Sequence, residues 1–181
     1  MKKMKESFGN GSNKRPILKI PHSNLERVLE ILAIASIIIQ IAMLTAYWSR
    51  IPQRIVTHIG IDGRPDRWGG RGELLVLPII SVVLYVLFTT LSKFPHIFNY
   101  IVDINEENAK YQYSNARTLM TAIKSEMLMF FTVFQYNSLM DALNRKSYFG
   151  QSALPIFIIT IFATLIYFIR KSLKKNEPNK G

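Results

Sequence analysis

Long apolar segments are the feature that most constrains this chain. Residues 28–47, 74–91 and 153–169 are runs of 17 to 20 residues that contain one charged side chain, Glu30. A helix needs about 20 apolar residues to cross the hydrocarbon core of a bilayer, because it rises about 1.5 Å per residue. The runs therefore predict membrane-spanning helices. Gln40 is expected to face another helix, since an unpaired amide is costly in lipid.

A fourth span is expected over residues 120–143, although this segment is more polar than the others. Lys124 and Glu126 lie near its start, and we expect both side chains to extend to the cytoplasmic interface. A helix is expected to begin in water near Asn105 and to continue into this span. Three residues further along form its expected polar face: Gln135, Asn137 and Asp141.

Basic residues indicate the orientation of the spans. Lys and Arg number sixteen in the two tails and in residues 93–124, against seven in the other two connections. Basic connections tend to stay in the cytoplasm. We therefore expect a multi-pass cell-membrane protein of bacterial type with both termini in the cytoplasm. This distribution also accounts for the net charge of +11, so the lipid bilayer is the expected partner and nucleic acid is not.

The expected fold class is an all-α integral membrane protein with four transmembrane helices. Residues 1–26 are predicted to be a disordered basic tail, because they are too polar to bury enough apolar surface. Residues 27–170 form the membrane domain, and residues 171–181 form a second basic tail. The chain has no cysteine, which excludes disulfides, Cys-ligated zinc and thiol catalysis.

A compact extracytoplasmic loop is expected at residues 48–72, between the first two spans. Residues 54–59 (RIVTHI) have the β-branched character of a short extended segment. Asp62-Gly63 predicts a tight turn, and residues 64–66 predict a second bend. Gly69-Gly70 is expected to let the backbone return toward the second span.

This loop contains a distinctive set of short motifs: Ile51-Pro52, Thr57-His58 and residues 62–69 (DGRPDRWG). Together they resemble a bacterial membrane domain of unknown function that forms the N-terminal half of SdpI-type immunity proteins. The pattern of that domain is close to LP-x-x-IPTHFN-x-x-G-x-PD-x-WG. This chain departs from the pattern at three positions: Val56, Gly60 and Gly70.

The resemblance implies an immunity or signal-sensing protein that binds a peptide toxin or an envelope protein through residues 48–72. The binding residues expected from it are Thr57, His58, Asp62, Gly63, Arg64, Pro65, Asp66, Arg67 and Trp68. The second half of the chain departs further from the six-helix SdpI architecture. The Asn…Arg-Thr…Ser-Glu motif of that family is matched with different spacing by Asn115, Arg117, Thr118, Ser125 and Glu126.

A metal-binding site is an alternative to partner binding for this loop. His58, Asp62 and Asp66 offer a nitrogen and carboxylate oxygens that suit zinc or calcium. In the competing interpretation, the two aspartates cap turns and His58 bonds a backbone carbonyl. Proline and glycine between the three prevent a helix from aligning them, which favours the second interpretation. No cofactor is expected.

Two other classes of function remain open. Enzymatic activity, including that of a metal-dependent membrane enzyme, is not expected, because Lys124 and Glu126 are two residues apart and point to different helix faces. A homo-oligomeric permease or channel is the main alternative, since four spans alone leave little room for a solute path. The five loop arginines would meet either an acidic partner or lipid headgroups: Arg50, Arg54, Arg64, Arg67 and Arg71.

Overall fold

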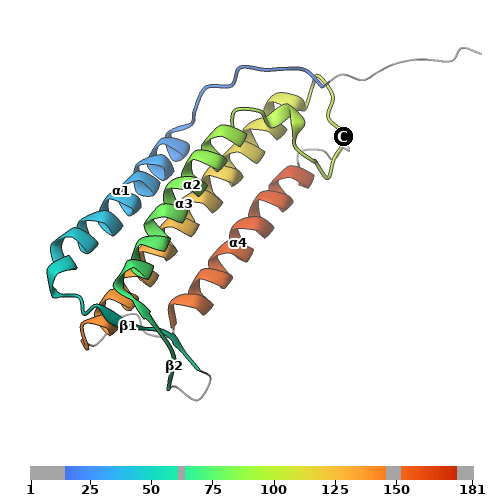
Figure 1. The fold of residues 1–181 in the computed structure, drawn as a ribbon. Helices are drawn as coiled ribbons and strands as arrows, with labels where there is room; N and C mark the ends of the chain where they lie inside the picture. The colour runs from blue at the N-terminus through green and yellow to red at the C-terminus, as the bar shows by residue number, and fades with distance from the viewer. Residues whose placement is uncertain (1–14, 61–63, 146–151, 175–181) are drawn as a thin grey trace, which may run out of the picture.

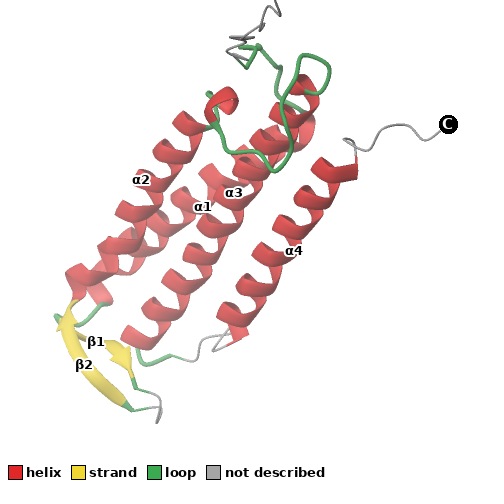
Figure 2. Ribbon diagram, turned by 90° about the vertical axis from the view of Figure 1, so that its right-hand side faces the viewer, coloured by secondary structure: helices red, strands yellow, loops and turns green. Residues whose placement is uncertain are grey.

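Four α-helices lie side by side in the computed structural model, with a β-hairpin at one end (Figure 1). The structure describes residues 15–60, 64–145 and 152–174. The helices are α1 (Asn24–Tyr47), α2 (Val76–Leu91), α3 (Ala109–Ala142) and α4 (Ala153–Lys174). The hairpin pairs β1 (Arg54–Ile59) with β2 (Pro65–Gly70), and short 3-10 helices lie at Trp48–Arg50, Arg71–Leu75 and Pro95–Ile97. The chain therefore runs alternately up and down the bundle, with the start of α1 and the end of α4 opposite the hairpin (Figure 2).

Three of the predicted spans are confirmed as long apolar helices. Among the described residues, Asn24–Arg50, Arg71–Leu91 and Ala153–Lys174 are long and apolar enough to cross a membrane. Many of their large apolar side chains face outward, as they would toward lipid; examples are Ile31, Ile38, Ile79, Val83, Ile159 and Phe162. The length and composition of these helices are therefore consistent with a membrane protein.

The first helix begins one turn earlier than the apolar pattern predicts. Ser23 and Glu26 form a capping box, in which the Glu26 amide donates to the Ser23 hydroxyl at 3.1 Å. In return, the Ser23 amide donates to the Glu26 carboxylate at 2.8 Å. These two bonds satisfy backbone donors that the first turn would otherwise leave unpaired, so the helix starts at Asn24.

The central element of the bundle is α3, which packs against each of the other three helices. It has 34 residues and includes most of the expected fourth span. Its start lies slightly after Asn105, because the Asn105 and Asn108 side chains accept hydrogen bonds from each other's backbone amides at 2.9 and 3.0 Å. Its composition is more polar than that of the three apolar helices, and its buried face carries most of that polarity.

The loop after α1 differs from the expected fold, because it contains two strands rather than one extended segment. β1 and β2 are antiparallel, with Arg54 opposite Gly70 and Val56 opposite Trp68. The second bend expected over residues 64–66 is therefore wrong, because Pro65 and Asp66 belong to a strand. The chain does turn toward the second span at Gly70, where β2 ends and the 3-10 helix before α2 begins. Proline is tolerated at the first position of a strand, where a missing amide donor costs little.

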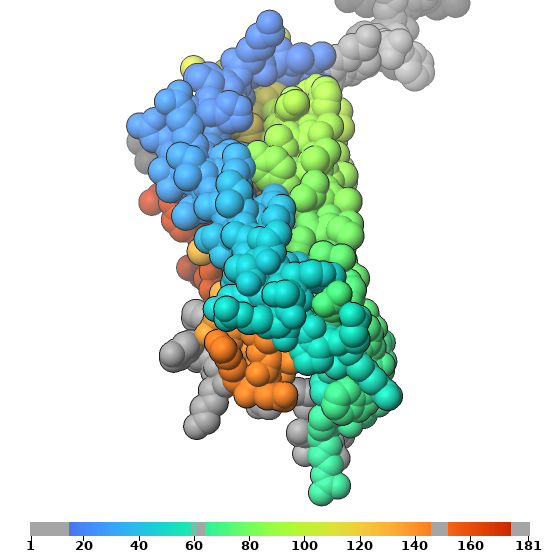
Figure 3. Space-filling model, turned by 60° about the vertical axis from the view of Figure 1, so that its left-hand side comes forward, coloured from blue at the N-terminus to red at the C-terminus, as the bar shows by residue number. Residues whose placement is uncertain are grey.

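The hairpin is attached to the bundle through an apolar core. Ile51 and Ile55, at the start of the loop, are 3% and 4% exposed. They belong to one cluster whose other buried members are Leu44, Leu74, Leu139, Met140 and Ala142. Figure 3 shows this loop, in cyan, seated over the ends of α2 and α3, in green and orange. The hairpin thus has a fixed base formed by α1, α3 and the 3-10 helix Arg71–Leu75.

Candidate functional site

The hairpin brings together four of the residues expected to bind a partner. His58 Nδ1 lies 2.6 Å from Asp66 Oδ1, and both side chains are exposed. Arg67 Nε donates to the Thr57 hydroxyl at 3.2 Å, and Arg67 Nη2 donates to Glu73 at 3.0 Å. Because the strands are antiparallel, residues eight to ten apart in sequence become neighbours. The result is an exposed, hydrogen-bonded polar face.

Arginines stack on aromatic rings around this face. Trp68 is 51% exposed, and the Arg54 guanidinium lies 5.7 Å from the centre of its ring. Nearer the bundle, the Arg71 guanidinium lies 4.8 Å from the Trp48 ring and donates to the Trp48 carbonyl at 3.3 Å. Stacking of this kind holds a guanidinium in place while leaving its charge available.

The predicted metal-ligand set is only partly within the described residues. His58 and Asp66 are adjacent, whereas Asp62 lies outside the described residues, as does Gly63. Over residues 15–60, 64–145 and 152–174, no three His, Cys, Asp or Glu side chains group as metal ligands. The metal site therefore stays a prediction that depends on Asp62.

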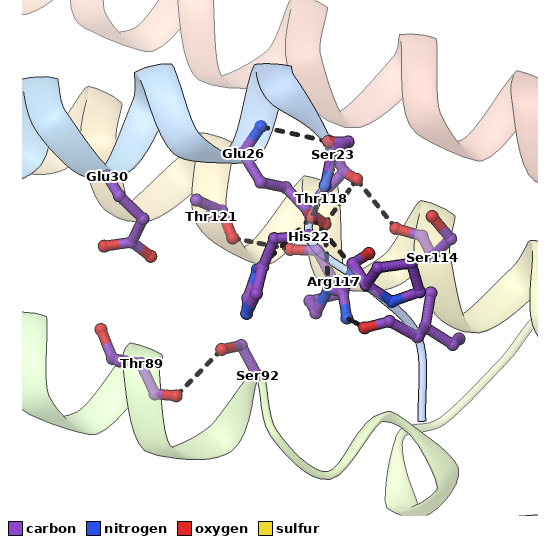
Figure 4. Close-up of polar contacts among 12 residues, drawn as sticks. His22, Ser23, Glu26, Glu30, Thr89, Ser92, Ser114, Arg117, Thr118 and Thr121 are labelled. Atoms are coloured by element: carbon purple, nitrogen blue, oxygen red, sulfur yellow. Dashed lines mark hydrogen bonds and ion pairs between the residues drawn. The ribbon is translucent and has the colours of Figure 1, made fainter. Parts of the chain in front are cut away.

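A second site, whose burial and ion pairing the sequence does not predict, lies inside the bundle near the other end. Arg117 of α3 donates from Nε and Nη2 to the two carboxylate oxygens of Glu26 on α1, each at 3.0 Å. The Thr118 hydroxyl adds a bond to the same carboxylate at 2.9 Å. Glu26 is 0% exposed. Figure 4 shows the Glu26 carboxylate enclosed by these groups and by the Ser23 cap.

Arg117 also binds the segment that precedes α1. It donates to the backbone carbonyls of Ile20 and Pro21, each at 2.7 Å. Four bonds from one planar guanidinium use most of its five donors. Arg117 therefore joins the entrance of α1 to the centre of the bundle.

Residues 15–23 continue across this end of the bundle. Arg15 donates to the Phe98 carbonyl at 2.5 Å and lies 5.5 Å from the centre of the Tyr100 ring. Burial raises the pKa of the Tyr100 phenol above its ordinary value; the nearby Tyr113 adds to this and the Arg15 charge opposes it. Residues 1–14 of the expected basic tail lie outside the described part of the chain.

The expectation that Lys124 extends to the cytoplasmic interface is wrong. The Lys124 side chain is 1% exposed and is paired with Glu30 of α1. Its ammonium also donates to the Thr89 hydroxyl at 2.8 Å and lies 4.6 Å from the centre of the Tyr85 ring, both on α2. An acid one turn beyond Glu26 makes this inward position more favourable than the interface, because it neutralises the charge inside the bundle.

The middle of the bundle is joined by neutral polar groups. Gln40 donates to Thr132 of α3 at 3.2 Å and accepts from Ser81 of α2 at 3.0 Å. The prediction that Gln40 faces another helix is therefore confirmed. The polar face expected from Gln135, Asn137 and Asp141 is not a single face, since Gln135 is fully buried, Asn137 is half-buried and Asp141 is exposed.

Glu126 lies on a different face of α3 from Lys124, as their spacing predicts. It accepts a hydrogen bond from the Thr164 hydroxyl of α4 at 2.5 Å. Asn115, further along the same face, donates to the Phe168 carbonyl of α4 at 3.0 Å. Among the described residues, α3 thus has ion pairs with α1 on one side and hydrogen bonds to α4 on the other.

Residues 35–82 match a family model described as "Domain of unknown function (DUF1648)". The matched region runs from α1 through the hairpin into α2 and covers less than half of the chain. The expected resemblance to a domain of unknown function in this region is confirmed at that level.

A curated relative from Archaeoglobus fulgidus, described as "Uncharacterized protein", is 35% identical over 92 residues. The similarity covers 41% of this chain and 50% of the relative. The chain therefore spans half the length of that relative. No solved structure matches this chain.

Proposed function

We propose that this chain is a multi-pass membrane protein that binds an acidic partner through its hairpin. The partner would be a peptide toxin or an envelope protein, and the role would be immunity or signal sensing of the SdpI type. The observation that carries the proposal is the exposed Trp68 with Arg54 stacked on it, on a hairpin anchored in the core. Aromatic and arginine side chains on a rigid support are typical of binding surfaces.

The proposal includes four spans, with both termini in the cytoplasm and the hairpin outside. Two features support α3 as the fourth span. It packs against all three apolar helices, and its buried cations at 117 and 124 are each paired with an acid of α1. Paired and inward-facing charges are the form in which ionisable residues occur within bilayers.

Anionic lipid headgroups are the competing ligand for the arginines. A membrane surface and a soluble partner can be distinguished by the fluorescence of Trp68. The chain has two tryptophans, so Trp48→Phe leaves Trp68 as the single reporter. This variant, in nanodiscs of zwitterionic phosphatidylcholine, would be titrated with an acidic polyglutamate peptide.

We expect a saturable change in Trp68 fluorescence, with an apparent affinity lowered about tenfold or more by Arg54→Glu with Arg64→Glu. The matched control is Lys110→Glu with Lys174→Glu, which reverses two exposed charges at the other end of the bundle. Equal effects of the two pairs, or no saturable change, would refute the acidic partner. If the Trp68 fluorescence changes on placing anionic lipid in the nanodiscs, and does not change with the peptide, the arginines bind lipid headgroups.

A homo-oligomeric permease or channel is the second candidate function. The buried Lys124–Glu30 pair favours it, because ionisable groups inside a bundle often mark solute paths. Chemical cross-linking of the solubilised protein tests the oligomer that such a path needs. A monomer at all protein concentrations would remove this candidate.

A further inference from the structure

Polar side chains of α3 hold α4 in the bundle. Gln112 donates to the Ser172 carbonyl at 3.0 Å and accepts from the Ser172 hydroxyl at 2.6 Å. At the other end of the interface, Phe130 stacks on Phe157 with ring centres 4.2 Å apart. Between these contacts lies Glu126, bonded to Thr164. Glu126 thus contributes an acidic side chain to the contacts between α3 and α4.

Three glutamates of the bundle differ in what surrounds their carboxylates. Both oxygens of Glu26 are hydrogen-bonded. Glu30 Oε2 is buried without a hydrogen-bond partner among the described residues, but Glu30 has the Lys124 ammonium beside it. Glu126 has one hydroxyl partner, and its Oε2 is buried without a hydrogen-bond partner among the described residues. Asn115 Oδ1, three turns away on the same face, is also buried and unpartnered there.

No cation within the described residues is paired with Glu126. Lys124, two residues earlier, faces α1 and α2. On α4, the described titratable groups other than the exposed Tyr167 are Arg170, Lys171 and Lys174. These three cations lie at least six residues beyond Thr164, toward the end of the helix.

The Glu126 side chain is half-buried, and its Oε2 atom is buried with neither a hydrogen-bond donor nor a cation among the described residues. A negative charge on such an oxygen is costly, and a carboxylate in this position normally takes up a proton instead. We propose that Glu126 is a proton-binding site of the membrane domain. The bound proton makes Glu126 a neutral acid at neutral pH, and the neutral acid holds α4 against α3. When the proton leaves, the negative charge on the half-buried carboxylate draws water into the interface and α4 moves away from α3.

Infrared spectroscopy of the full chain in nanodiscs tests the protonation state. At neutral pH we expect the carbonyl stretch of a protonated carboxylic acid, shifted by transfer to heavy water. Glu126→Gln should remove this band, and the matched control Glu107→Gln, at an exposed glutamate before α3, should keep it. An absent band, or one that persists in Glu126→Gln, would overturn the proposal.

A second variant covers the case in which Glu126→Gln fails to fold. Thr164→Val removes the hydroxyl that donates to Glu126, so the band should move to higher wavenumber. An unchanged wavenumber would show that the protonated acid is not bonded to Thr164, and it would refute the proton-binding site at Glu126.

The movement of α4 has its own measurement. The chain lacks cysteine, so Lys110→Cys with Leu173→Cys places two spin labels on exposed positions of α3 and α4. Raising the pH should lengthen the label-to-label distance in this background and leave it unchanged when Glu126→Gln is added. If raising the pH lengthens the label-to-label distance equally with and without Glu126→Gln, the position of α4 does not depend on the protonation of Glu126.

Discussion

Arg117 and Glu26 join α3 to α1 through two parallel hydrogen bonds of 3.0 Å each, between residues 91 positions apart in the chain. Both side chains are almost fully removed from solvent. A charge in this position is stable only with its partner, because the desolvation cost of each ion is offset by the other. The pair therefore determines how α1 and α3 are aligned.

We expect Arg117→Ala to lower the free energy of unfolding by about 3–5 kcal/mol, because it leaves the Glu26 carboxylate buried without its cation. Circular dichroism during unfolding in mixed micelles measures the change. The double variant Glu26→Gln with Arg117→Met is the control, and it should be less destabilised than Arg117→Ala since no charge remains buried. A loss below about 0.5 kcal/mol in Arg117→Ala would show that the pair does not hold the helices.

The Lys124–Glu30 pair leads to an asymmetric prediction. Lys124 is 1% exposed and Glu30 is 26% exposed, so only the acid has access to the surroundings when its partner is removed. Glu30→Leu should therefore destabilise the protein by about 3 kcal/mol and Lys124→Leu by about half as much, because the first change leaves a fully buried ammonium. The same unfolding measurement applies. A larger loss of unfolding free energy in Lys124→Leu than in Glu30→Leu would contradict the greater burial of the Lys124 side chain.

Much of the helical framework is predictable from sequence, because bilayer thickness sets a minimum apolar length. The run at residues 28–47 predicts α1 to within one turn, and the difference comes from the cap at Ser23. The second strand could not be predicted in the same way. Pro65 and the two glycines at 69 and 70 are typical of turns, and only pairing with β1 makes this segment a strand.

The buried pairs were missed for a related reason. Glu26 and Glu30 are one turn apart on α1, whereas Arg117 and Lys124 are two turns apart on α3, so the spacing of the acids does not reveal which base each acid contacts. The Ser-x-x-Glu cap at Ser23 is, by contrast, a local signal that the sequence contains. Partners more than 90 residues away cannot, however, be assigned from local patterns.

Gly69 allows a close contact within the hairpin. A Cβ atom there would lie 1.8 Å from Glu73 Oε1 and 2.9 Å from Thr57 Cγ2. We expect Gly69→Ala to displace Glu73 from Arg67 and to cost about 1 kcal/mol, since the Glu73 side chain can move but Thr57 must shift as well. Limited proteolysis of the hairpin provides the measurement. Gly72→Ala is the control, because a Cβ at Gly72 would meet nothing within 4 Å; equal cleavage rates in the two variants would refute the contact.

The side of the membrane that each end of the bundle faces can be measured with single cysteines, because the natural chain has none. Arg64→Cys labels the hairpin end and Leu173→Cys labels the opposite end. With a membrane-impermeant maleimide on intact cells, we expect the first to react without lysis and the second only after lysis. The reverse result would place the hairpin in the cytoplasm and remove the extracellular partner.

The same assay decides whether α3 is the fourth span. Asp103 precedes α3 and Arg145 follows it, and both are exposed. If α3 crosses the bilayer, Arg145→Cys reacts in intact cells as Arg64→Cys does, and Asp103→Cys reacts only after lysis. Labelling of Asp103→Cys and Arg145→Cys on one side would contradict the span. The buried ions of α3 would then lie outside the bilayer, where breaking an ion pair costs less because water can solvate the remaining charge.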